Sequence, residues 1–384
     1  MLQHYNSWGY YTYAGRQYFD QFDVYDAAIA ARDDKPAITF SWPFHDEVDS
    51  RIEPEQTLGQ LYKMRAHQIR DEYDYIILMY SGGTDSTQIL QTFLDANIFI
   101  DEVITTYPFG FIEKLPAFVP PEHPLAYLYE FRFACTKGLQ QLHSRSPNTK
   151  ITLWDSTSAY TSKRMDEWTN CKIGGRISGG VHGLFHGLKR SFEKVAFERH
   201  MDQLHGVSVG VIYGIEKPLL RIEDNELFLY FTDLGRMINK FLLDFGDQIA
   251  FDPIMFFWGN RLIPIKQGHL IKRVLNNNPL TVEYIRNEME GFIQVDKGIP
   301  GIDIKLIYPD WPGWYQTANK RSEAGILDFF SGRQALDAAT VRTEFFNRRF
   351  GKLTGSTMKM HTKKRSAFKG FLSRQHSLGA ISCA

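Results

Sequence analysis

The fold of this chain is constrained most strongly by residues 75–92, which read YIILMYSGGTDSTQILQT. The unbroken apolar run at 75–80 is typical of a strand that is buried on both faces, as in a parallel sheet. Small and polar residues fill 81–86, and residues 88–94 have helical spacing. A strand, a short loop and a helix in this order direct backbone N–H groups to a helix N-terminus, which favours binding of an anion such as phosphate.

The loop sequence SGGTDS resembles the SGGxDS pyrophosphate loop of the N-type ATP pyrophosphatases, the PP-loop superfamily. It lacks the lysine and the longer spacing of a Walker A loop. The superfamily includes asparagine synthetases, GMP synthetases, tRNA thiolases, lysidine synthetases, 7-cyano-7-deazaguanine synthase and phosphoadenylylsulfate reductases. The resemblance implies an α/β fold with a HUP-like parallel sheet, and it implies ATP and Mg²⁺ as cofactors. The alternative to a pyrophosphate loop is a Gly-Gly turn between a strand and a helix that binds no ligand.

The resemblance assigns the loop residues to ATP and its metal ion. Backbone N–H groups would hold the phosphates, two serine hydroxyls would assist, and Asp85 would hold Mg²⁺ directly or through water. The loop residues are Ser81, Gly82, Gly83, Thr84, Asp85 and Ser86. In the superfamily the end of the following strand lines the adenosine pocket, and the matching positions here are Thr105, Thr106 and Tyr107. An ordinary strand end is an equally good interpretation of those three residues.

A second buried strand is expected at 207–213, and it ends at Gly214. In the asparagine synthetase branch, the matching strand ends in a Gly-x-Gly-x-Asp-Glu run near magnesium and pyrophosphate. This chain has Gly214, Ile215, Glu216 and Lys217 there, so only the glycine and one acid match in kind. The resemblance implies that Glu216 holds magnesium or positions substrate, and that Lys217 neutralises charge on the leaving pyrophosphate. A strand-to-turn junction with both charges in solvent is the alternative.

The pattern along the chain predicts four parts. They are an aromatic-rich N-terminal extension at 1–57, a PP-loop domain at 58–225, a mainly helical C-terminal domain at 226–351, and a basic, partly disordered tail at 352–384. In the first part a short strand is expected at 38–44. In the second part we expect an amphipathic helix at 58–73, strands at 100–107 and 150–155, and a helix at 126–142. In the third part we expect helices at 234–245, 269–275, 282–292 and 324–350.

Two further segments leave alternatives open. The glycine-rich stretch at 170–190 is either a lid over the nucleotide or a surface loop. It contains His182 and His186, which are spaced as a metal-binding pair on a helix would be, but no acid or cysteine lies at the spacing that would complete a zinc site. The turn-rich, aromatic run at 309–315 is consistent with a substrate pocket or with the packing of helix ends.

The net charge and the cysteine content limit the classes of partner and the cellular location that the sequence predicts. The chain has 44 basic and 44 acidic residues, so its net charge predicts neither nucleic acid nor membrane as a partner. Cys135, Cys171 and Cys383 are far apart and odd in number, which excludes a CxxC pair and predicts a reducing, cytoplasmic location. No signal peptide and no membrane span are expected.

The tail after Glu344 has no acidic residue. Its basic residues are Arg348, Arg349, Lys352, Lys359, Lys363, Lys364, Arg365, Lys369 and Arg374. Such a block is typically solvated, and the alternative is an arm that contacts tRNA or another polyanion.

These features together predict an adenylating enzyme that converts ATP to AMP and pyrophosphate. It would activate an oxygen of a small-molecule acceptor for attack by ammonia or an amine. The amphipathic helix before the strand resembles the same junction in asparagine synthetase synthase domains. Residue 2 is Leu, where the glutamine-dependent enzymes have a catalytic cysteine, so no glutaminase domain is expected. The alternatives are a PP-loop enzyme that modifies a nucleobase or tRNA, and a non-catalytic nucleotide-binding protein. The acceptor, the nitrogen or sulfur donor and the oligomeric state are left open.

Overall fold

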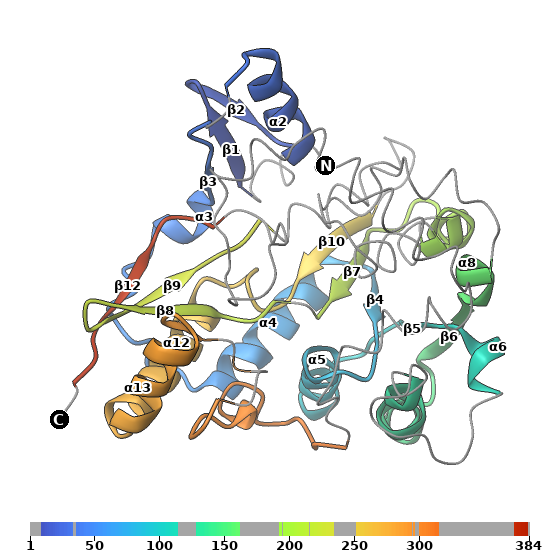
Figure 1. Ribbon diagram of the computed structural model, residues 1–384. Helices are drawn as coiled ribbons and strands as arrows, with labels where there is room; N and C mark the ends of the chain where they lie inside the picture. Colours follow the sequence, from blue (N-terminus) through green and yellow to red (C-terminus); the bar gives the residue numbers. More distant parts are fainter. Residues whose placement is uncertain are drawn as a thin grey trace.

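The computed structural model of the chain is shown in Figure 1. It describes residues 9–33, 36–113, 128–161, 192–193, 195–214, 216–233, 251–293, 295, 299–314 and 372–382. The glycine-rich stretch at 170–190, with His182 and His186, lies outside the described residues, as do Cys171, Cys383 and the helices expected at 234–245 and 324–350.

A five-stranded parallel sheet forms the centre of the molecule. Its strands are β4 (Tyr75–Met79), β5 (Glu102–Tyr107), β6 (Lys150–Asp155), β7 (Val209–Tyr213) and β10 (Phe251–Met255), in the order β10-β7-β4-β5-β6. Every neighbouring pair in the sheet is parallel. The strand before the SGGTDS loop therefore occupies the middle of the sheet, which explains its continuous apolar sequence. The expected α/β class with a parallel sheet is confirmed.

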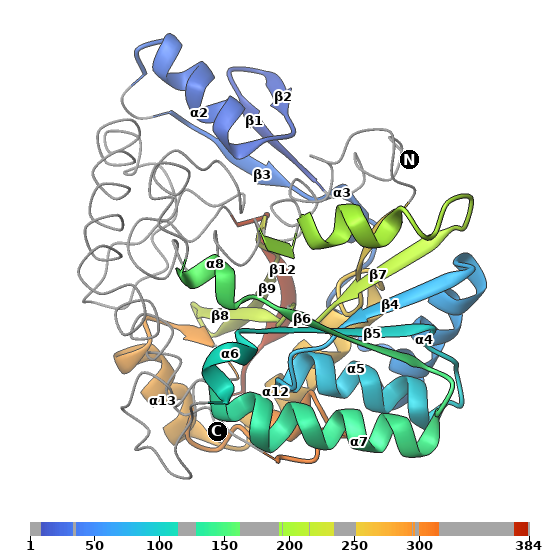
Figure 2. The same ribbon diagram turned by 90° about the vertical axis from the view of Figure 1, so that its right-hand side faces the viewer.

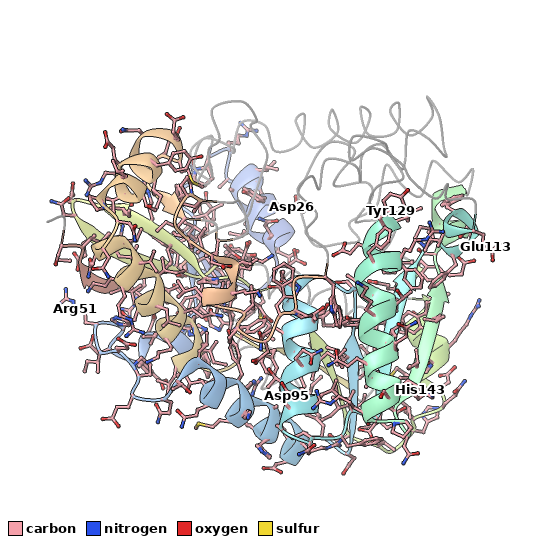
Figure 3. The ribbon with its side chains drawn as sticks, turned by 90° about the horizontal axis from the view of Figure 1, so that it is seen from below. Asp26, Arg51, Asp95, Glu113, Tyr129 and His143 are labelled. Carbon is pink, nitrogen blue, oxygen red and sulfur yellow. The ribbon has the colours of Figure 1, made fainter. Side chains whose placement is uncertain are left out.

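Helices cover both faces of this sheet. Helices α4 (Leu58–Glu72), α5 (Thr84–Asp95) and α7 (Thr136–Arg145) pack on one face, and α5 and α7 lie side by side (Figures 2 and 3). The opposite face is covered by the helix at 195–201, whose Phe197 and Met201 pack against Ile77 and Ile104. Helix α7 is preceded by a π-helical turn, η2 (Phe131–Cys135). The short helices α6 (Phe109–Ile112) and α8 (Thr157–Thr161) follow β5 and β6.

The helix expected at 58–73 is confirmed as α4, and its start has a specific cause. The Thr57 hydroxyl accepts a hydrogen bond from the Gln60 backbone N–H, and the Gln60 side chain accepts one from the Thr57 N–H. This capping box satisfies two backbone donors that a helix start leaves without partners. Helix α4 therefore begins at a fixed residue and leads directly into β4.

A second, antiparallel sheet lies beside the first. Its strands are β8 (Leu219–Glu223), β9 (Glu226–Tyr230), β11 (Phe292–Ile293) and β12 (His376–Ala380), in the order β11-β8-β9-β12. Asp224 and Asn225 form the turn between β8 and β9, with φ of 45° and 64°. Both residue types tolerate this left-handed conformation, which two-residue hairpin turns require. The domain change expected at 225–226 thus falls in the turn of a hairpin that the sequence analysis missed.

Two helices follow in the C-terminal part, α12 (Leu262–Asn276) and α13 (Pro279–Glu288). They confirm the helices expected at 269–275 and 282–292, except that the second one ends at Glu288 and its last expected residue, Phe292, begins β11. Helix α12 contacts α4 as well as β9 and β12, so it connects the two sheets. In the part of the chain that the structure describes, no helix combines the length and the apolar content that a bilayer crossing requires.

The N-terminal part is a small unit of its own (Figure 1). Strands β1 (Tyr10–Tyr13), β2 (Arg16–Tyr18) and β3 (Thr39–Ser41) form an antiparallel sheet with α2 (Gln21–Ala30), and α3 (Pro43–Asp46) follows. The strand expected at 38–44 is confirmed in β3, which ends before Pro43. The Tyr11 hydroxyl donates a 2.6 Å hydrogen bond to Asp233, just after β9, and this contact ties the unit to the second sheet.

The end of the basic tail is part of the fold. Strand β12 pairs with β9, the Ser50 hydroxyl donates to the Ser377 carbonyl at 2.6 Å, and Lys272 Nζ donates to the Leu378 carbonyl at 2.7 Å. The expectation of a solvated tail is therefore wrong for residues 376–380. The reason is that His376 and Leu378 alternate with half-buried neighbours and are themselves buried. The rest of the basic block up to 371 lies outside the described residues.

Replacing Leu378 tests the role of this last strand. Leu378 is fully buried against α12, so Leu378→Ala should lower the free energy of unfolding by about 2–5 kcal/mol, measured by urea denaturation. The control is Leu280→Ala on α13, where the side chain is 79% exposed and the change should stay below about 0.5 kcal/mol. Equal effects of the two substitutions would show that β12 does not contribute to the stability of the fold.

A buried acid, Glu102, lies at the start of β5, at the edge of the sheet opposite the loop. It accepts hydrogen bonds from Tyr75 and Thr152, lies 2.8 Å from His200 Nε2, and forms a 3.3 Å ion pair with Lys150. Burial alone raises the pKa of Glu102. The hydrogen bonds from His200 and Thr152 and the charges of His200 and Lys150 outweigh burial, so the net pKa is lowered. Glu102 therefore anchors the helix at 195–201 to the sheet in its ionised form.

This anchor predicts an acid-dependent loss of stability. Because the folded pKa is below the unfolded value of about 4.3, the contribution of Glu102 is present above that pH and is lost as the pH falls through the folded pKa. Glu102→Gln should therefore destabilise the protein at pH 7 by about 1–3 kcal/mol and flatten its stability curve below pH 4.3. Urea denaturation at pH 3–7 measures this. Glu198→Gln, at an exposed position on the same helix, should leave the curve unchanged.

Candidate nucleotide-binding site

The SGGTDS loop is held in one conformation by its own two serines. The Ser81 backbone N–H donates to Ser86 Oγ at 3.3 Å, the Gly83 N–H donates to Ser81 Oγ at 3.3 Å, and the two hydroxyls are 3.2 Å apart. The Ser86 hydroxyl also reaches the Gly83 carbonyl at 3.4 Å. The serines therefore shape the loop, in addition to any contact they make with a ligand.

The second half of the SGGTDS sequence is already the first turn of helix α5, which begins at Thr84 with Gly83 as its N-cap residue. The first turn of a helix has no internal acceptors for its N–H groups, so those of Thr84, Asp85 and Ser86 are available to a ligand. Together with the positive end of the helix dipole, they favour an anion at this position. The strand, loop and helix expected from the sequence are confirmed, and they present the donors that a phosphate needs.

Two glycines allow the backbone to pack closely around the loop. Gly82 has φ of +80°, and a Cβ there would lie 2.7–2.9 Å from N, Cα and Cβ of Cys135 in η2. Gly214, at the end of β7, faces the first turn of α5, and a Cβ there would lie 2.8 Å from the Ser86 backbone nitrogen. Any larger residue at either position would force the backbone apart. These contacts fix the loop against α7 on one side and against β7 on the other.

The residues at the end of β5 support the loop from below. The Thr105 hydroxyl donates to the Tyr80 carbonyl at 2.9 Å, and the Tyr107 hydroxyl donates to the Ser81 carbonyl at 2.5 Å. Thr106 is 7% exposed, and its hydroxyl has no hydrogen-bond partner among the described residues. Thr105 and Tyr107 thus hold the backbone of the loop, and of the three residues only Thr106 keeps an unused hydroxyl for a ligand such as adenosine.

The end of β7 brings a lysine and a second acid to the loop. Lys217 Nζ lies 3.2 Å from Asp85 Oδ2. Glu216 is fully buried, and its Oε2 accepts a 3.1 Å hydrogen bond from the Phe257 N–H. Asp85 Oδ1 and Glu216 Oε1 are both buried and have no hydrogen-bond partner in the described part of the chain. The structure therefore brings together Asp85, Gly214, Glu216 and Lys217, which the sequence analysis placed in one site.

Glu216 is held in an environment that opposes its charge. Burial raises its pKa well above the ordinary value, and the charge of Asp85 raises it further, while the Phe257 N–H and Arg65 act in the opposite direction. Lys217 and Arg65 offset the charge of the two carboxyl groups only in part, because burial still keeps the pKa of Glu216 raised, and this leaves room for a further positive charge. Oxygen atoms of this kind are the preferred ligands of Mg²⁺, so Asp85 Oδ1 and Glu216 Oε1 fit a magnesium ion.

The sequence analysis missed four residues around Asp85. Tyr62 on α4, Gln88 on α5 and Tyr308 are buried behind the loop, and the exposed Asp310 accepts a hydrogen bond from Gln88. Tyr308 comes one residue before the turn-rich run at 309–315. Nothing in the local pattern of Tyr62 or Gln88 marks a site, because both stand at ordinary helix positions. A fifth residue, Glu130, approaches the loop, since a Cβ on Gly83 would lie 3.2 Å from Glu130 Oε1.

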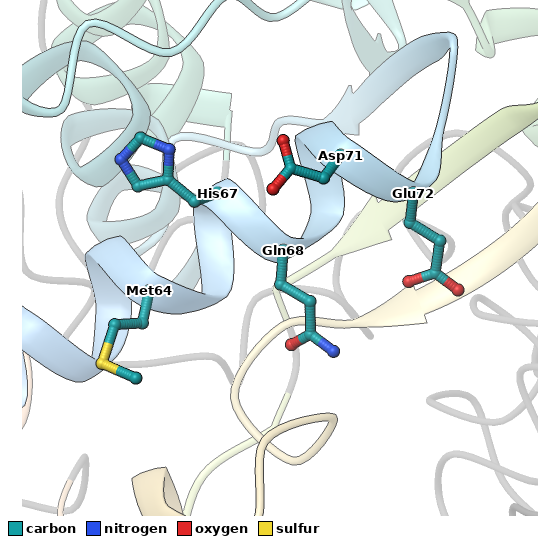
Figure 4. Close-up of a pocket in the computed structure, with 5 residues that line it drawn as sticks. All are labelled: Met64, His67, Gln68, Asp71 and Glu72. Atoms are coloured by element: carbon teal, nitrogen blue, oxygen red, sulfur yellow. The ribbon is translucent and has the colours of Figure 1, made fainter.

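A separate hollow of about 600 Å³ lies on α4 and is lined by Met64, His67, Gln68, Asp71 and Glu72 (Figure 4). These residues come from the half of α4 that leads into the start of β4, whereas the SGGTDS loop follows the end of β4. Among the described residues, no group of three or more His, Cys, Asp or Glu side chains is arranged to hold a metal ion. The hollow therefore adds no ligands to the candidate site.

Comparison with known proteins gives no family for this chain. No protein-family model matches it, and a search of curated proteins finds no match either.

The environment of Glu216 predicts that its replacement stabilises the protein. Because the folded pKa is above the unfolded value of about 4.3, the folded state loses stability as the pH rises from that value toward the folded pKa. Glu216→Gln keeps the acceptor for the Phe257 N–H and removes the charge. It should raise the free energy of unfolding at pH 8 by about 1–3 kcal/mol, and by much less at pH 4.5. Thermal unfolding at both pH values, with exposed Glu283→Gln as control, measures this; an equal gain at both would contradict it.

Proposed function

We propose that the chain is an adenylating enzyme of the PP-loop type, with a HUP-like nucleotide-binding fold, that converts ATP to AMP and pyrophosphate. The observation that carries the proposal is the SGGTDS loop at the end of the central strand, with Asp85 paired to Lys217 from the segment that follows the neighbouring strand β7. Ligands of open α/β sheets bind at the carboxyl ends of the strands, and these residues all lie at that edge. We further propose a cytoplasmic location.

The loop and the start of α5 would bind the phosphates of ATP. Gly82, Gly83 and Thr84 supply backbone N–H groups without a side chain that blocks the approach of the ligand at the two glycines. The Ser81 and Ser86 hydroxyls would contribute while they hold the loop closed. Thr106, at the end of β5, would face the adenosine. A magnesium ion would be held by Asp85 and Glu216 and would supply screening of the phosphate charges.

The reaction itself requires little covalent chemistry from the protein. An oxygen of the acceptor attacks the α-phosphorus of ATP, the bond from that phosphorus to the bridging oxygen breaks, and pyrophosphate leaves with the electron pair. Lys217 pairs with Asp85 at 3.2 Å, and it would neutralise charge that develops on the leaving group. Ammonia or an amine then attacks the acceptor carbon that carries the adenylated oxygen. The bond between that carbon and the oxygen breaks, and AMP leaves with the oxygen. The loop positions the phosphates in line for the first step.

The acceptor is the open part of the proposal. A small molecule is our first choice, as in the asparagine synthetase branch. A PP-loop enzyme that modifies a nucleobase or tRNA would use the same first half-reaction. The basic tail favours that alternative less than its composition suggests, because one of its arginines, Arg374, is already paired with Asp46 at 2.6 Å on the surface. A truncation after residue 351 would remove β12, so it cannot test nucleic-acid binding separately from folding.

Removing the Asp85 carboxylate tests the proposed reaction. Asp85→Asn keeps the shape of the side chain but removes the partner of Lys217 and one ligand of magnesium. Release of pyrophosphate and AMP from ATP, with Mg²⁺ and pools of carboxylate and nucleobase acceptors, should fall by about 10²–10³-fold. Phosphorus NMR and thin-layer chromatography identify the products.

The matched control is Asp95→Asn at the other end of the same helix, where Asp95 forms an ion pair with Arg145 on the surface. This variant should retain full activity. Production of ADP and phosphate by the wild type would contradict the pyrophosphatase assignment. Binding of ATP without turnover in any pool would favour the non-catalytic alternative.

A further inference from the structure

Residues 307–310 lie against the start of α5, although more than two hundred positions separate them in the sequence. They follow the turn η5 (Ile304–Leu306) and belong to the orange trace that passes below α5 in Figure 1. The Tyr62 hydroxyl on α4 donates to the Ile307 carbonyl at 2.5 Å, and Gln267 on α12 donates to the Tyr62 hydroxyl at 2.9 Å. Two helices thus hold the segment in place from behind.

A reciprocal pair of hydrogen bonds joins the segment to α5. Gln88 Nε2 donates to Asp310 Oδ2 at 2.8 Å, and the Asp310 backbone N–H donates to Gln88 Oε1 at 2.9 Å. Gln88 is fully buried and lies one turn after Asp85 on the same helix. The Gln88–Asp310 clamp therefore fixes the segment relative to the first turn of α5, where the loop ends.

Tyr308 lies between these two attachments, and Asp85 is among the charged groups that act on its hydroxyl. The side chain is fully buried, and its hydroxyl has no hydrogen-bond partner in the described part of the chain by strict geometry. Burial raises the pKa of the Tyr308 hydroxyl well above its ordinary value, and the nearby Asp85 carboxylate raises it further. Asp85 Oδ1 is likewise a buried acceptor without a partner. A buried hydroxyl that served packing alone would leave a donor unsatisfied, which native structures avoid.

We propose that Tyr308 is a positioning residue for Asp85, and that the Gln88–Asp310 clamp holds Tyr308 in place. Lys217 fixes one oxygen of the Asp85 carboxylate and the Tyr308 hydroxyl donates to the other, so the carboxylate has a single orientation. An oxygen that accepts this hydrogen bond keeps a second lone pair for a metal ion. The C-terminal part of the chain thereby completes the nucleotide site. This inference rests on the proposed function, since it concerns the orientation of the residue that holds magnesium.

The first test is Tyr308→Phe, which removes only the hydroxyl. Loss of a group that orients a metal ligand typically weakens metal binding or activity by 10–100-fold. We expect about that loss in the affinity for Mn²⁺, measured by electron paramagnetic resonance in the presence of a non-hydrolysable ATP analogue. We also expect a lower kcat for pyrophosphate release at saturating Mg²⁺, with little change in the KM for ATP.

The matched control is Tyr75→Phe. Tyr75 also donates to a buried carboxylate, Glu102, but at the opposite edge of the sheet. It should lower stability without changing the affinity for Mn²⁺. Equal Mn²⁺ affinities of Tyr308→Phe, Tyr75→Phe and the wild type would overturn the inference while the wild type still releases pyrophosphate. A wild type that releases no pyrophosphate would instead count against the proposed function.

The second test addresses the clamp and includes its own rescue. Gln88→Glu places a carboxylate against Asp310, so it should separate the segment from α5 and lower the Mn²⁺ affinity by about tenfold. Adding Asp310→Asn restores one donor and one acceptor. The Mn²⁺ affinity of the double variant should then return to within about twofold of the wild-type value, a difference well below the loss that a misplaced metal ligand typically causes. Failure of the double variant to recover, with both proteins folded by circular dichroism, would overturn the role of the clamp.

Discussion

The end of β7 lies so close to the first turn of α5 that no side chain fits between them, and the candidate site depends on this contact. A Cβ on Gly214 would lie within 3 Å of the backbone of Asp85 and Ser86. The parallel register of β4 and β7, in which Met79 is opposite Tyr213, determines where the two strands end relative to each other. Because β4 and β7 both end at the same level of the sheet, the residues that follow Tyr213 contact the loop that follows Met79. This register places Lys217 on Asp85.

One of the carboxyl groups that meet there is buried in an environment that opposes its charge. Asp85 and Glu216 contribute two carboxyl groups, and Lys217 is the cation in direct contact with Asp85. Burial of an acid without full compensation is unfavourable, and the raised pKa of Glu216 reflects that. A fold selected only for stability would have an apolar residue or an amide at this position. The local cost is consistent with a site whose stable state includes a bound cation or a positively charged ligand.

Local sequence patterns could predict the central unit but not the contacts that complete it. The apolar run of β4, the glycines of the loop and the helical spacing of α5 are all contained in residues 75–95, and each follows from short-range geometry. Strand β12 was missed because Leu378 is buried only through pairing with β9, nearly 150 positions earlier. The β8–β9 hairpin was missed although Asp224 and Asn225 are a recognisable turn pair. Thr105 and Tyr107 were expected to line the adenosine pocket, but their hydroxyls are directed to backbone carbonyls of the loop.

The same distinction applies to the site itself. A peptide with the sequence of β4, the loop and α5 would contain the N–H donors, yet it would lack every group that orients Asp85. Lys217 and Glu216 arrive through the pairing of β7, and Tyr308 arrives through the attachment of residues 307–310 to α4 and α5. These contributions come from three separate segments, so displacement of any one of them changes the surroundings of the same carboxylate. The C-terminal part of the chain is therefore a structural component of the candidate site, because its buried tyrosine lies behind the SGGTDS loop.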